Sequence, residues 1–445
     1  MKHAFLIAAP HSGSGKTTIA RGLMALLKKK GVKVQPFKCG PDYIDTKFHA
    51  EVCGRPSVNL DSFMASPEHI RELFARYGED ADVCVVEGMM GLFDGYDRDK
   101  GSSAEIARIL DIPVVLVVDA KSAAYSMAPL LFGFTHFASH YSPSTPHASP
   151  LNIAGVIFNK VGSEKHFQML QQVCDDLDIK CFGYLPKRAT LEQDSRYLGL
   201  DFSKSAESEE LVTLLEQHIN CKEMLRHAVS RAETDGFLGG NQCFPRRKPM
   251  VSPMVSNALV AFNDESFSFV YQETLDRFGS VHYFDPEREV PDFEGIDLLY
   301  LPGGYPEKHV EALVKNEGCR KAIKAFAEQG GRVHAECGGM MYLCEKILTD
   351  DPQQPGAMRE WPMCGVLPYQ ISARQQDRKL SLGYRRFVLD GKEYRGHEFH
   401  YTQLVNQGSP LISAAQVYNA KGEPVDTPVF KYKNVLASYT HLFKI

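Results

Sequence analysis

The chemistry that this chain can perform is most visible around Cys337. The surrounding segment reads G-R-V-H-A-E-C-G-G-M-M-Y-L. Val333 to Ala335 predict a short strand, and Gly338 and Gly339 begin a helical pattern after the cysteine. Such a corner is typical of a nucleophile elbow, where small neighbours permit a strained backbone and the corner side chain is pushed into the open.

A thiol at this corner has a specific use. A thiolate at a helix N-terminus is stabilised by the helix dipole, and a backbone N–H such as that of Gly338 can bind the oxyanion formed when sulfur attacks a carbonyl. The alternative is a structural cysteine, because free cysteines are among the most buried residues. The two flanking glycines favour a catalytic Cys337.

A nucleophilic thiol needs a base and an oxyanion site. The histidines downstream are His397 and His400 in R-G-H-E-F-H-Y, and His441 in S-Y-T-H-L. The first two are one residue short of the H-E-x-x-H zinc spacing and would not share a helix face. We favour His441 as the base, with the others shaping a pocket. Gly303 and Gly304, after a predicted strand, are a second source of oxyanion-binding N–H groups or simply a tight turn.

A second kind of chemistry is indicated at the N-terminus. Ala4 to Ala8 predict a strand that leads into A-P-H-S-G-S-G-K-T-T and then a helical pattern. This is a P-loop, in which Lys16 reaches the β and γ phosphates and the Thr17 hydroxyl binds Mg²⁺. Ala9 and Pro10 stand where the loop's leading glycine is expected. The residues predicted to bind ATP are Gly13, Ser14, Gly15, Lys16, Thr17 and Thr18, with Asn159 as a candidate for contact with the base.

Several acids follow predicted strands near this loop. Asp42 and Asp45 lie three residues apart in K-C-G-P-D-Y-I-D, where they could hold a metal, orient a phosphoryl acceptor or be solvated. Glu87 ends a buried apolar run, and Asp94 lies on the glycine-rich loop after it. Because ligands of α/β sheets bind at the carboxyl ends of the strands, we expect Glu87 near Mg²⁺ and Asp94 near the substrate. Asn159 also follows a strand, and the alternative for it is an ordinary turn.

The elements that carry these residues alternate between strands and helices, which predicts mostly parallel sheets wrapped by helices. The segment His136 to Pro150 is expected to be an exposed loop insertion. We predict an ATP-dependent domain at 1–202, a connecting helix and linker at 203–256, and a second α/β domain at 257–445. The expected strands are Ala4–Ala8, Val32–Phe37, Val83–Val86, Val114–Val118, Ile153–Phe158, Lys180–Leu185, Leu259–Phe262, Asp297–Leu301 and Val333–Ala335.

Composition narrows the function classes. The 445 residues carry a formal charge of -5 with no sustained basic run, so we expect no nucleic-acid partner and no membrane surface. The 11 cysteines lack C-x-x-C spacing, which favours a reducing cytoplasm over a disulfide framework. The strand at the N-terminus leaves no room for a signal peptide, and no apolar run is long enough to span a membrane.

Taken together, the motifs resemble a known family. They are S-G-S-G-K-T-T, F-K-C-G-P-D-Y-I-D, V-E-G-M-M-G-L-F-D-G, L-P-G-G-Y-P-E, H-A-E-C-G-G-M-M-Y-L and S-Y-T-H-L, in this order along nearly the whole chain. The sequence is similar to the corrin-biosynthesis glutamine amidotransferases typified by cobyrinate a,c-diamide synthase. The resemblance implies a dethiobiotin-synthetase-like P-loop domain followed by a class I glutamine amidotransferase-like domain, both α/β.

The resemblance also implies roles for residues. Cys337 would be the glutaminase nucleophile and His441 its base. Many class I glutaminases carry a glutamate two residues after this histidine, but Phe443 stands there, so another group would orient the base. The implied magnesium ligands are Thr17, Asp45 and Glu87, and the residues implied in phosphoryl transfer and substrate binding are Asp42, Asp45, Glu87 and Asp94.

The implied reaction takes ATP with Mg²⁺, glutamine, and a corrinoid or related tetrapyrrole, and amidates two of its carboxylates. Relatives that act on hydrogenobyrinate or nickel sirohydrochlorin, and cobyrate synthase with its usually longer chain, are alternatives. A different class is a P-loop switch ATPase with an inactive glutaminase domain, but such ATPases carry an early lysine where His11 stands. The sequence leaves the oligomeric state open, with a homodimer as one option.

Overall fold

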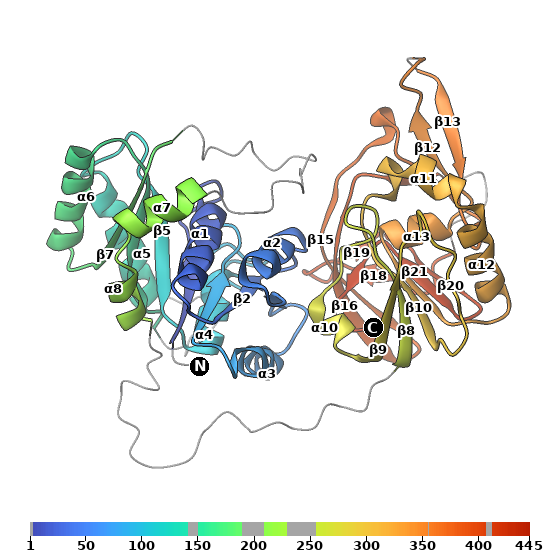
Figure 1. Cartoon of the computed structure of the whole chain (residues 1–445), viewed down its shortest axis with the longest axis horizontal. Helices are drawn as coiled ribbons and strands as arrows, with labels where there is room; N and C mark the ends of the chain where they lie inside the picture. The colour runs from blue at the N-terminus through green and yellow to red at the C-terminus, as the bar shows by residue number, and fades with distance from the viewer. Residues whose placement is uncertain (1–2, 141–149, 189–208, 229–254, 355, 406–411) are drawn as a thin grey trace, which may run out of the picture. The chain divides into compact units, whose positions relative to one another are not determined.

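The computed structural model describes residues 3–140, 150–188, 209–228, 255–354, 356–405 and 412–445. The chain divides into two compact units, Met1–Lys248 and Pro249–Ile445 (Figure 1). Each unit is built around its own sheet and core. Within the described residues, no helix combines the length and the apolar character that a membrane crossing requires.

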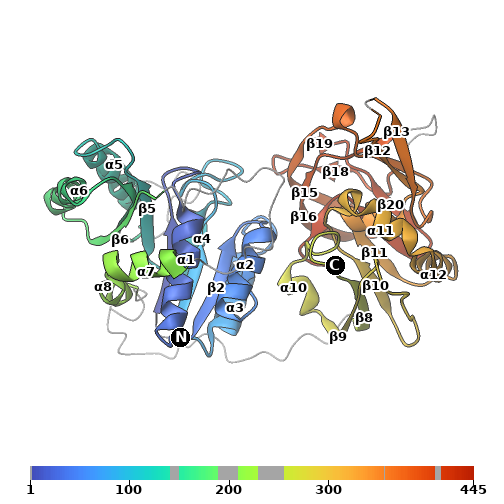
Figure 2. The same cartoon turned by 45° about the horizontal axis from the view of Figure 1, so that its top comes forward.

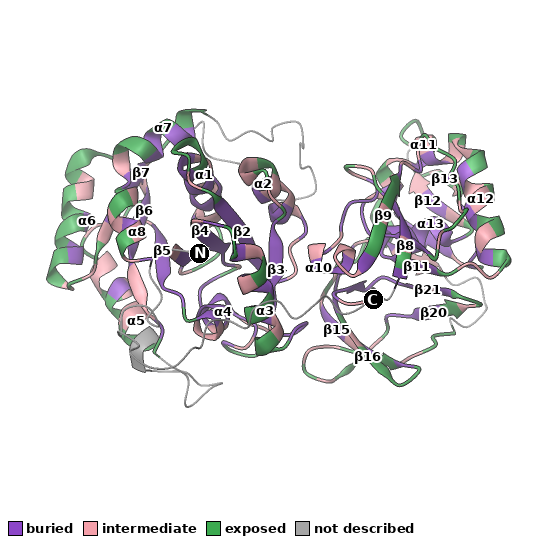
Figure 3. Cartoon of the chain, turned by 60° about the horizontal axis from the view of Figure 1, so that its bottom comes forward, coloured by how far each residue is buried: buried purple, intermediate pink, exposed green. Residues whose placement is uncertain are grey.

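A seven-stranded parallel sheet forms the centre of the first unit, in the order β3-β2-β4-β1-β5-β6-β7. Its strands are buried almost throughout, as expected for a parallel sheet covered on both faces (Figure 3). The predicted α/β fold with a parallel sheet is thereby confirmed. The strands are β1 His3–Ala8, β2 Val34–Cys39, β3 Val58–Leu60, β4 Val83–Glu87, β5 Val114–Asp119, β6 Ile153–Val161 and β7 Cys181–Pro186.

Helices cover the two faces of this sheet. One core joins apolar side chains of α1, α7 and α8 to the strands, and α5 and α6 lie on the opposite side (Figure 2). The helices are α1 Lys16–Lys29, α2 Ile44–Cys53, α3 Pro67–Gly78, α4 Ser103–Leu110, α5 Met127–His140, α6 Glu164–Asp176, α7 Glu209–His218 and α8 Cys221–Arg226.

Helices α7 and α8 fall in the segment expected to connect the domains, but they pack on the first unit. A methyl group added to Gly22 of α1 would lie 2.4 Å from Cδ1 of Leu215 and 3.0 Å from Cδ2 of Leu211. The backbone N–H of Ala4 in β1 donates to the carbonyl of Ala228 at 2.8 Å. The apolar face of α7 therefore completes the core over α1 instead of bridging two domains.

The loop insertion expected at His136 to Pro150 is wrong for its first five residues, which form the end of α5. The helix continues because its side chains have partners: the ring of Phe137 packs edge-on against that of Phe93, with 4.9 Å between centroids. Residues 141–149 of this expectation lie outside the described residues.

A six-stranded sheet in the order β20-β21-β11-β10-β8-β9 forms the centre of the second unit. It is parallel except for the edge pair β20 and β21. Helices and turns flank it, and the main core gathers α11, α12 and α13 against its strands. The elements are β8 Val255–Ala261, β9 Phe278–Phe284, β10 Leu298–Leu301, β11 Val333–Glu336, β20 Val429–Tyr432, β21 Val435–Ser438, α10 Gln272–Leu275, α11 Val310–Lys315, α12 Glu317–Glu328, α13 Gly338–Leu343 and the 3-10 turns η2 Pro306–Lys308 and η3 Gln375–Asp377.

Two smaller sheets accompany this centre, and their order is β13-β12-β14-β17 and β19-β18-β15-β16-β22. The second of them carries His397 and His400 on β16 and His441 on β22, with His397 directly opposite His441. Their strands are β12 Lys346–Asp350, β13 Met358–Pro362, β14 Gln370–Ser372, β17 Gln403–Val405, β15 Ser381–Leu389, β16 Lys392–His400, β18 Val417–Tyr418, β19 Pro424–Val425 and β22 His441–Leu442.

Candidate functional sites of the two units

The P-loop lies between β1 and α1, as its sequence predicts. Gly15, with φ 87°, immediately precedes α1, and Lys16, Thr17 and Thr18 form the first turn of that helix. Asn159, at the end of β6, supports the loop, because its Nδ2 donates to the carbonyl of Ser14 at 2.9 Å. A side chain at position 15 would place its Cβ 2.0 Å from this nitrogen. The structure thus gives Asn159 a role in holding the loop that leads into the helix.

The two residues that replace the leading glycine contact the loop after β4. The backbone N–H of Leu92 donates to the carbonyl of Ala9 at 2.8 Å, and a methyl group on Gly91 would lie 2.7 Å from the carbonyl of Pro10. Asp94 holds the same loop, since its Oδ2 accepts the N–H of Gly91 at 2.9 Å. Asp94 is therefore carried on a loop that is fastened to the nucleotide loop.

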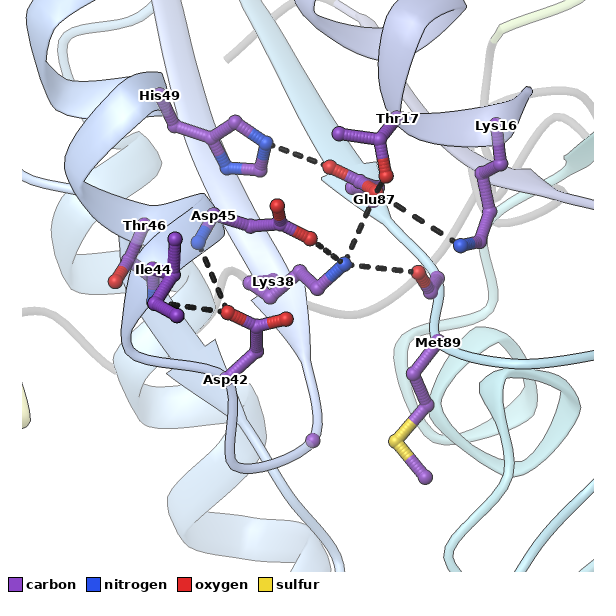
Figure 4. Close-up of polar contacts among 12 residues, drawn as sticks. Lys16, Thr17, Lys38, Asp42, Ile44, Asp45, Thr46, His49, Glu87 and Met89 are labelled. Atoms are coloured by element: carbon purple, nitrogen blue, oxygen red, sulfur yellow. Dashed lines mark hydrogen bonds and ion pairs between the residues drawn. The ribbon is translucent and has the colours of Figure 1, made fainter. Parts of the chain in front are cut away.

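Glu87 is the centre of a buried charged cluster beside the P-loop (Figure 4). Its Oε1 accepts the hydroxyl of Thr17 and lies 3.0 Å from Nζ of Lys38. Its Oε2 lies 2.7 Å from Nε2 of His49. Lys38 also donates to Oδ2 of Asp45 at 2.6 Å, so one ammonium joins two carboxylates. The predicted Thr17, Asp45 and Glu87 are brought together, and sequence analysis did not single out Lys38 and His49.

The charges of this cluster compensate one another. Burial by itself would raise the pKa of Glu87, but Lys38, His49 and Lys16 hold it well below its usual range. Burial would likewise lower the pKa of Lys38, but the carboxylates of Asp45 and Glu87 raise it above its usual value. Lys16 lies 3.8 Å from Glu87. Glu87 is therefore ionised and Lys38 is a cation, so the cluster holds compensating charges beside the P-loop.

The donor set fits a magnesium ion. Mg²⁺ prefers oxygen ligands, and the hydroxyl of Thr17 and the carboxylate of Glu87 are in direct contact at the start of α1. Asp45 provides a second carboxylate nearby, because Lys38 contacts both Asp45 and Glu87. Asp42 fixes the start of α2, because its Oδ1 accepts the N–H groups of Ile44 and Asp45, each at 2.9 Å (Figure 4).

The second unit contains the predicted elbow. Cys337 lies between β11 and α13 with φ 43° and ψ −106°, a conformation that non-glycine residues rarely adopt. A methyl group on Gly339 would lie 2.0 Å from the carbonyl of Leu301, and one on Gly338 would lie 2.9 Å from the backbone N of Gly304. The small neighbours are therefore required by close packing around the strained residue.

The expectation of an exposed thiol is wrong. Cys337 is 4% exposed, because the β16 strand passes over it, with the carbonyl of Phe399 4.0 Å from Sγ. Burial raises the pKa of the Cys337 thiol above its usual range, the charge of Glu307 adds to this, and the N–H of Gly338 opposes it. The resting group is a neutral thiol, so a base is needed to ionise it.

His441, the predicted base, lies against the loop that borders the elbow. Its ring packs on Gly303, where an added methyl group would lie 2.1 Å from Cε1, and Gly303 and Gly304 in turn border the elbow. Burial lowers the pKa of His441 to about 4, against a rise caused by Glu336 and by a hydrogen bond with the backbone of Phe269. The imidazole is therefore neutral near pH 7 and can accept a proton.

The predicted loops thus meet around one thiol. Gly304 and Gly338 lie within contact distance, and both carry N–H groups at the elbow, as an oxyanion site requires. His400 stacks on Tyr439 with 3.6 Å between ring centroids, and its Nε2 lies 2.7 Å from Oε1 of Glu398, which agrees with a role in shaping the pocket.

Sequence analysis missed Glu336, which directly precedes Cys337. Its carboxylate is 1% exposed and lies 3.9 Å from Nδ1 of His441. The only signal available from the sequence was a charged residue at the end of a buried apolar strand.

Comparisons with known proteins assign a family to each half of the chain. Residues 5–199 match the family described as the CobQ/CobB/MinD/ParA nucleotide binding domain, and residues 260–444 match the CobB/CobQ-like glutamine amidotransferase domain. The protein is therefore a nucleotide-binding unit joined to a glutamine amidotransferase unit, that is, a glutamine-dependent ligase.

Its full-length relatives define the family more closely. The chain is 35% identical to the cobyrinate a,c-diamide synthase of Caldanaerobacter subterraneus subsp. tengcongensis, over 99% of this chain and 95% of that protein. It is 37% identical to the cobyrinate a,c-diamide synthase of Listeria monocytogenes serovar 1/2a, over 98% of this chain and 95% of that protein. It is 35% identical to the hydrogenobyrinate a,c-diamide synthase of Brucella anthropi, over 98% of each chain. The chain belongs to the family of cobyrinate and hydrogenobyrinate a,c-diamide synthases.

Proposed function

We propose that this protein amidates the a and c side-chain carboxylates of cobyrinate, using ATP and glutamine. The observation that carries the proposal is the similarity over 98–99% of the chain to cobyrinate a,c-diamide synthases. Hydrogenobyrinate is the second candidate, because a relative named for that substrate is equally similar at 35% identity.

The first half-reaction activates a carboxylate. A carboxylate is a poor electrophile, so the γ-phosphoryl group of ATP is transferred to it, and the resulting acyl phosphate has a good leaving group. This transfer depends mainly on positioning and charge neutralisation. Lys16 and Lys38 offset phosphate charge, and Asp94 holds its loop against the nucleotide loop. Mg²⁺ would be held by Thr17 and Glu87, where it would supply further positive charge.

The second half-reaction releases ammonia from glutamine. His441 accepts the thiol proton, Cys337 attacks the amide carbon, and the N–H groups of Gly304 and Gly338 face the developing oxyanion. Ammonia leaves, and water assisted by His441 hydrolyses the thioester to glutamate. Ammonia then displaces phosphate from the acyl phosphate. Producing ammonia within the enzyme avoids its conversion to ammonium in neutral water.

The Cys337→Ala variant separates the two half-reactions. We expect it to lose glutamine-driven amidation and to retain amidation from added ammonium, because the ATP site lies in the other unit. Amidation is followed by product mass and glutamate release by an enzymatic assay. Loss of the ammonium-driven reaction in a folded variant would contradict the assignment of separate sites.

The substrate is identified by offering cobyrinate, hydrogenobyrinate and nickel sirohydrochlorin separately with ATP, Mg²⁺ and glutamine. Two amide additions to cobyrinate, read from the product mass, are expected. A preference for hydrogenobyrinate would change the assigned substrate but not the proposed mechanism. A folded wild-type protein that hydrolyses ATP but never releases glutamate would instead support a switch ATPase.

A further inference from the structure

Glu336 is a buried carboxylate that three donors hold in place. Its Oε2 accepts the hydroxyl of Tyr300 at 2.8 Å. Its Oε1 accepts the backbone N–H of Leu442 at 3.0 Å and lies 2.9 Å from Nε2 of His334. These groups come from β10, β22 and β11, so the carboxylate joins the strand before the nucleophile to the strand that carries the base.

The same carboxylate faces the base. Oε2 of Glu336 lies 3.9 Å from Nδ1 of His441, which is an ion-pair distance and too long for a hydrogen bond. The histidine cannot easily turn away, because its ring packs on Gly303 and also lies beside the ring of Phe269, with 6.3 Å between centroids. Glu336 thus stands beside a nitrogen that gains positive charge once the thiol proton is transferred.

The other acid near the base already has a cation. Glu398 on β16 accepts from Nε of Arg385 at 2.5 Å and from the hydroxyl of Thr427 at 2.7 Å, and its other oxygen contacts His400. The three partners of Glu336, by contrast, are a hydroxyl, a backbone N–H and the ring nitrogen of His334, and none of them is a permanent cation. The negative charge of Glu336 therefore remains available to an imidazolium.

Two further titratable groups surround this cluster. His397 lies opposite His441 in the β16 and β22 pair, and burial lowers its pKa to about 3, so it adds no charge near neutral pH. Glu307 acts on the thiol, where its charge raises the pKa of Cys337. An uncharged His397 cannot stabilise a protonated His441, and the contact that places a carboxylate at ion-pair distance from His441 is that of Glu336.

We propose that Glu336 is the positioning residue of the glutaminase site, the carboxylate that stabilises His441 as an imidazolium. In the place where many class I glutaminases carry a glutamate, two residues after the histidine, this chain has the buried Phe443. The residue before the nucleophile supplies the charge instead. This inference rests on glutamine hydrolysis by Cys337.

Glu336 acts between two proton transfers of His441. The proton of the Cys337 thiol moves to His441 as the sulfur–carbon bond to the glutamine amide forms. It then moves from His441 to the leaving nitrogen as the carbon–nitrogen bond breaks, giving ammonia and a thioester. Between the two transfers the imidazolium carries a positive charge in a site from which water is largely excluded, where a fixed carboxylate has its greatest effect.

The test compares Glu336→Gln with Tyr300→Phe. The first removes the charge and keeps an oxygen that can accept the N–H of Leu442; the second removes a hydrogen bond to the same carboxylate and keeps the charge. We expect Glu336→Gln to lower the glutaminase kcat by about 10²-fold with KM within about threefold, and to shift the acid limb of kcat/KM to lower pH. Tyr300→Phe removes one of the three donors and keeps the charge, so its acid limb should stay at the wild-type pH and its loss of kcat should be smaller than that of Glu336→Gln.

A kcat of Glu336→Gln within about threefold of wild type, with an unchanged acid limb, would overturn the proposal. So would an equal shift of the acid limb in Tyr300→Phe, because that variant keeps the charge and the shift would then not come from its loss. If Glu336→Gln does not fold, Glu336→Asp is the second variant, because its shorter side chain moves the charge away from His441 by about 1.5 Å. An unchanged kcat in Glu336→Asp would then contradict the proposed role of the charge. A wild-type protein that releases no glutamate would refute the glutaminase function itself, which is a separate result.

Discussion

Replacing Gly303 by alanine tests whether the base is held in place by its contact with the loop after β10. The added Cβ would lie 2.1 Å from Cε1 of His441. Ordinary carbon contacts are about 3.5–4.0 Å, so the imidazole must move by about 1.5 Å. A misplacement of about 1 Å in a catalytic group can cost about 10²-fold, and we therefore expect the glutaminase kcat to fall by about 10²-fold or more. The alanine keeps the backbone N–H, so the oxyanion donor itself is not removed.

The assay compares glutamate release, glutamine-driven amidation and ammonium-driven amidation in the same preparation. Gly318→Ala is the matched control in the same unit, because its nearest contact is the end of the exposed Val290 side chain at 2.9 Å. We expect the control to behave as wild type and Gly303→Ala to keep only the ammonium-driven reaction. Glutamate release by a folded Gly303→Ala within about threefold of wild type would refute the placement of His441.

Three further predictions concern charge, pH and the nucleotide loop. Lys38→Met removes the ammonium that Asp45 and Glu87 share and should lower the free energy of unfolding in urea by about 3–5 kcal/mol; a loss below about 1 kcal/mol would contradict the cluster. The pKa of His441 is about 4 in the folded protein and about 6.5 in the unfolded chain, so on acidification the unfolded chain takes up the proton first. The contribution of this histidine to the free energy of unfolding, about 3 kcal/mol, is therefore present above pH ~6.5 and is lost as the pH falls toward ~4. His441→Gln should flatten that part of the stability profile, and an unchanged slope would show that the base is not buried in its neutral form. Gly15→Ala, which brings Cβ to 2.0 Å from Asn159 at a φ of 87°, should raise the KM for ATP about tenfold or more and leave glutamate release unchanged; a normal KM would argue against this loop geometry.

Local sequence signals predicted the parts of both sites that depend on neighbouring residues. The strand, glycine loop and helix around Lys16 and the strand, thiol and helix around Cys337 are short-range patterns, and both were found where they were expected. The glycine pair Gly303 and Gly304 was predicted only as an oxyanion site or a tight turn, and the structure adds that Gly303 packs against His441.

Long-range pairing explains what the sequence could not provide. The contact between Glu336 and His441 joins residues 105 positions apart, through strands too short for periodicity to reveal. The cation of Lys38 at the end of β2 is buried only because β4 brings Glu87 beside it. The burial of Cys337 depends on β16, and the residues next to Cys337 in the sequence do not indicate that this distant strand covers it.

The packing of α7 and α8 has a practical consequence for dissecting this enzyme. Leu211 and Leu215 fill the space beside α1, and the carbonyl of Ala228 pairs with the first strand. A fragment ending at residue 202 would expose that apolar surface to water and invite aggregation. Separate expression of the ATP-dependent half should therefore retain the polypeptide at least as far as Ala228.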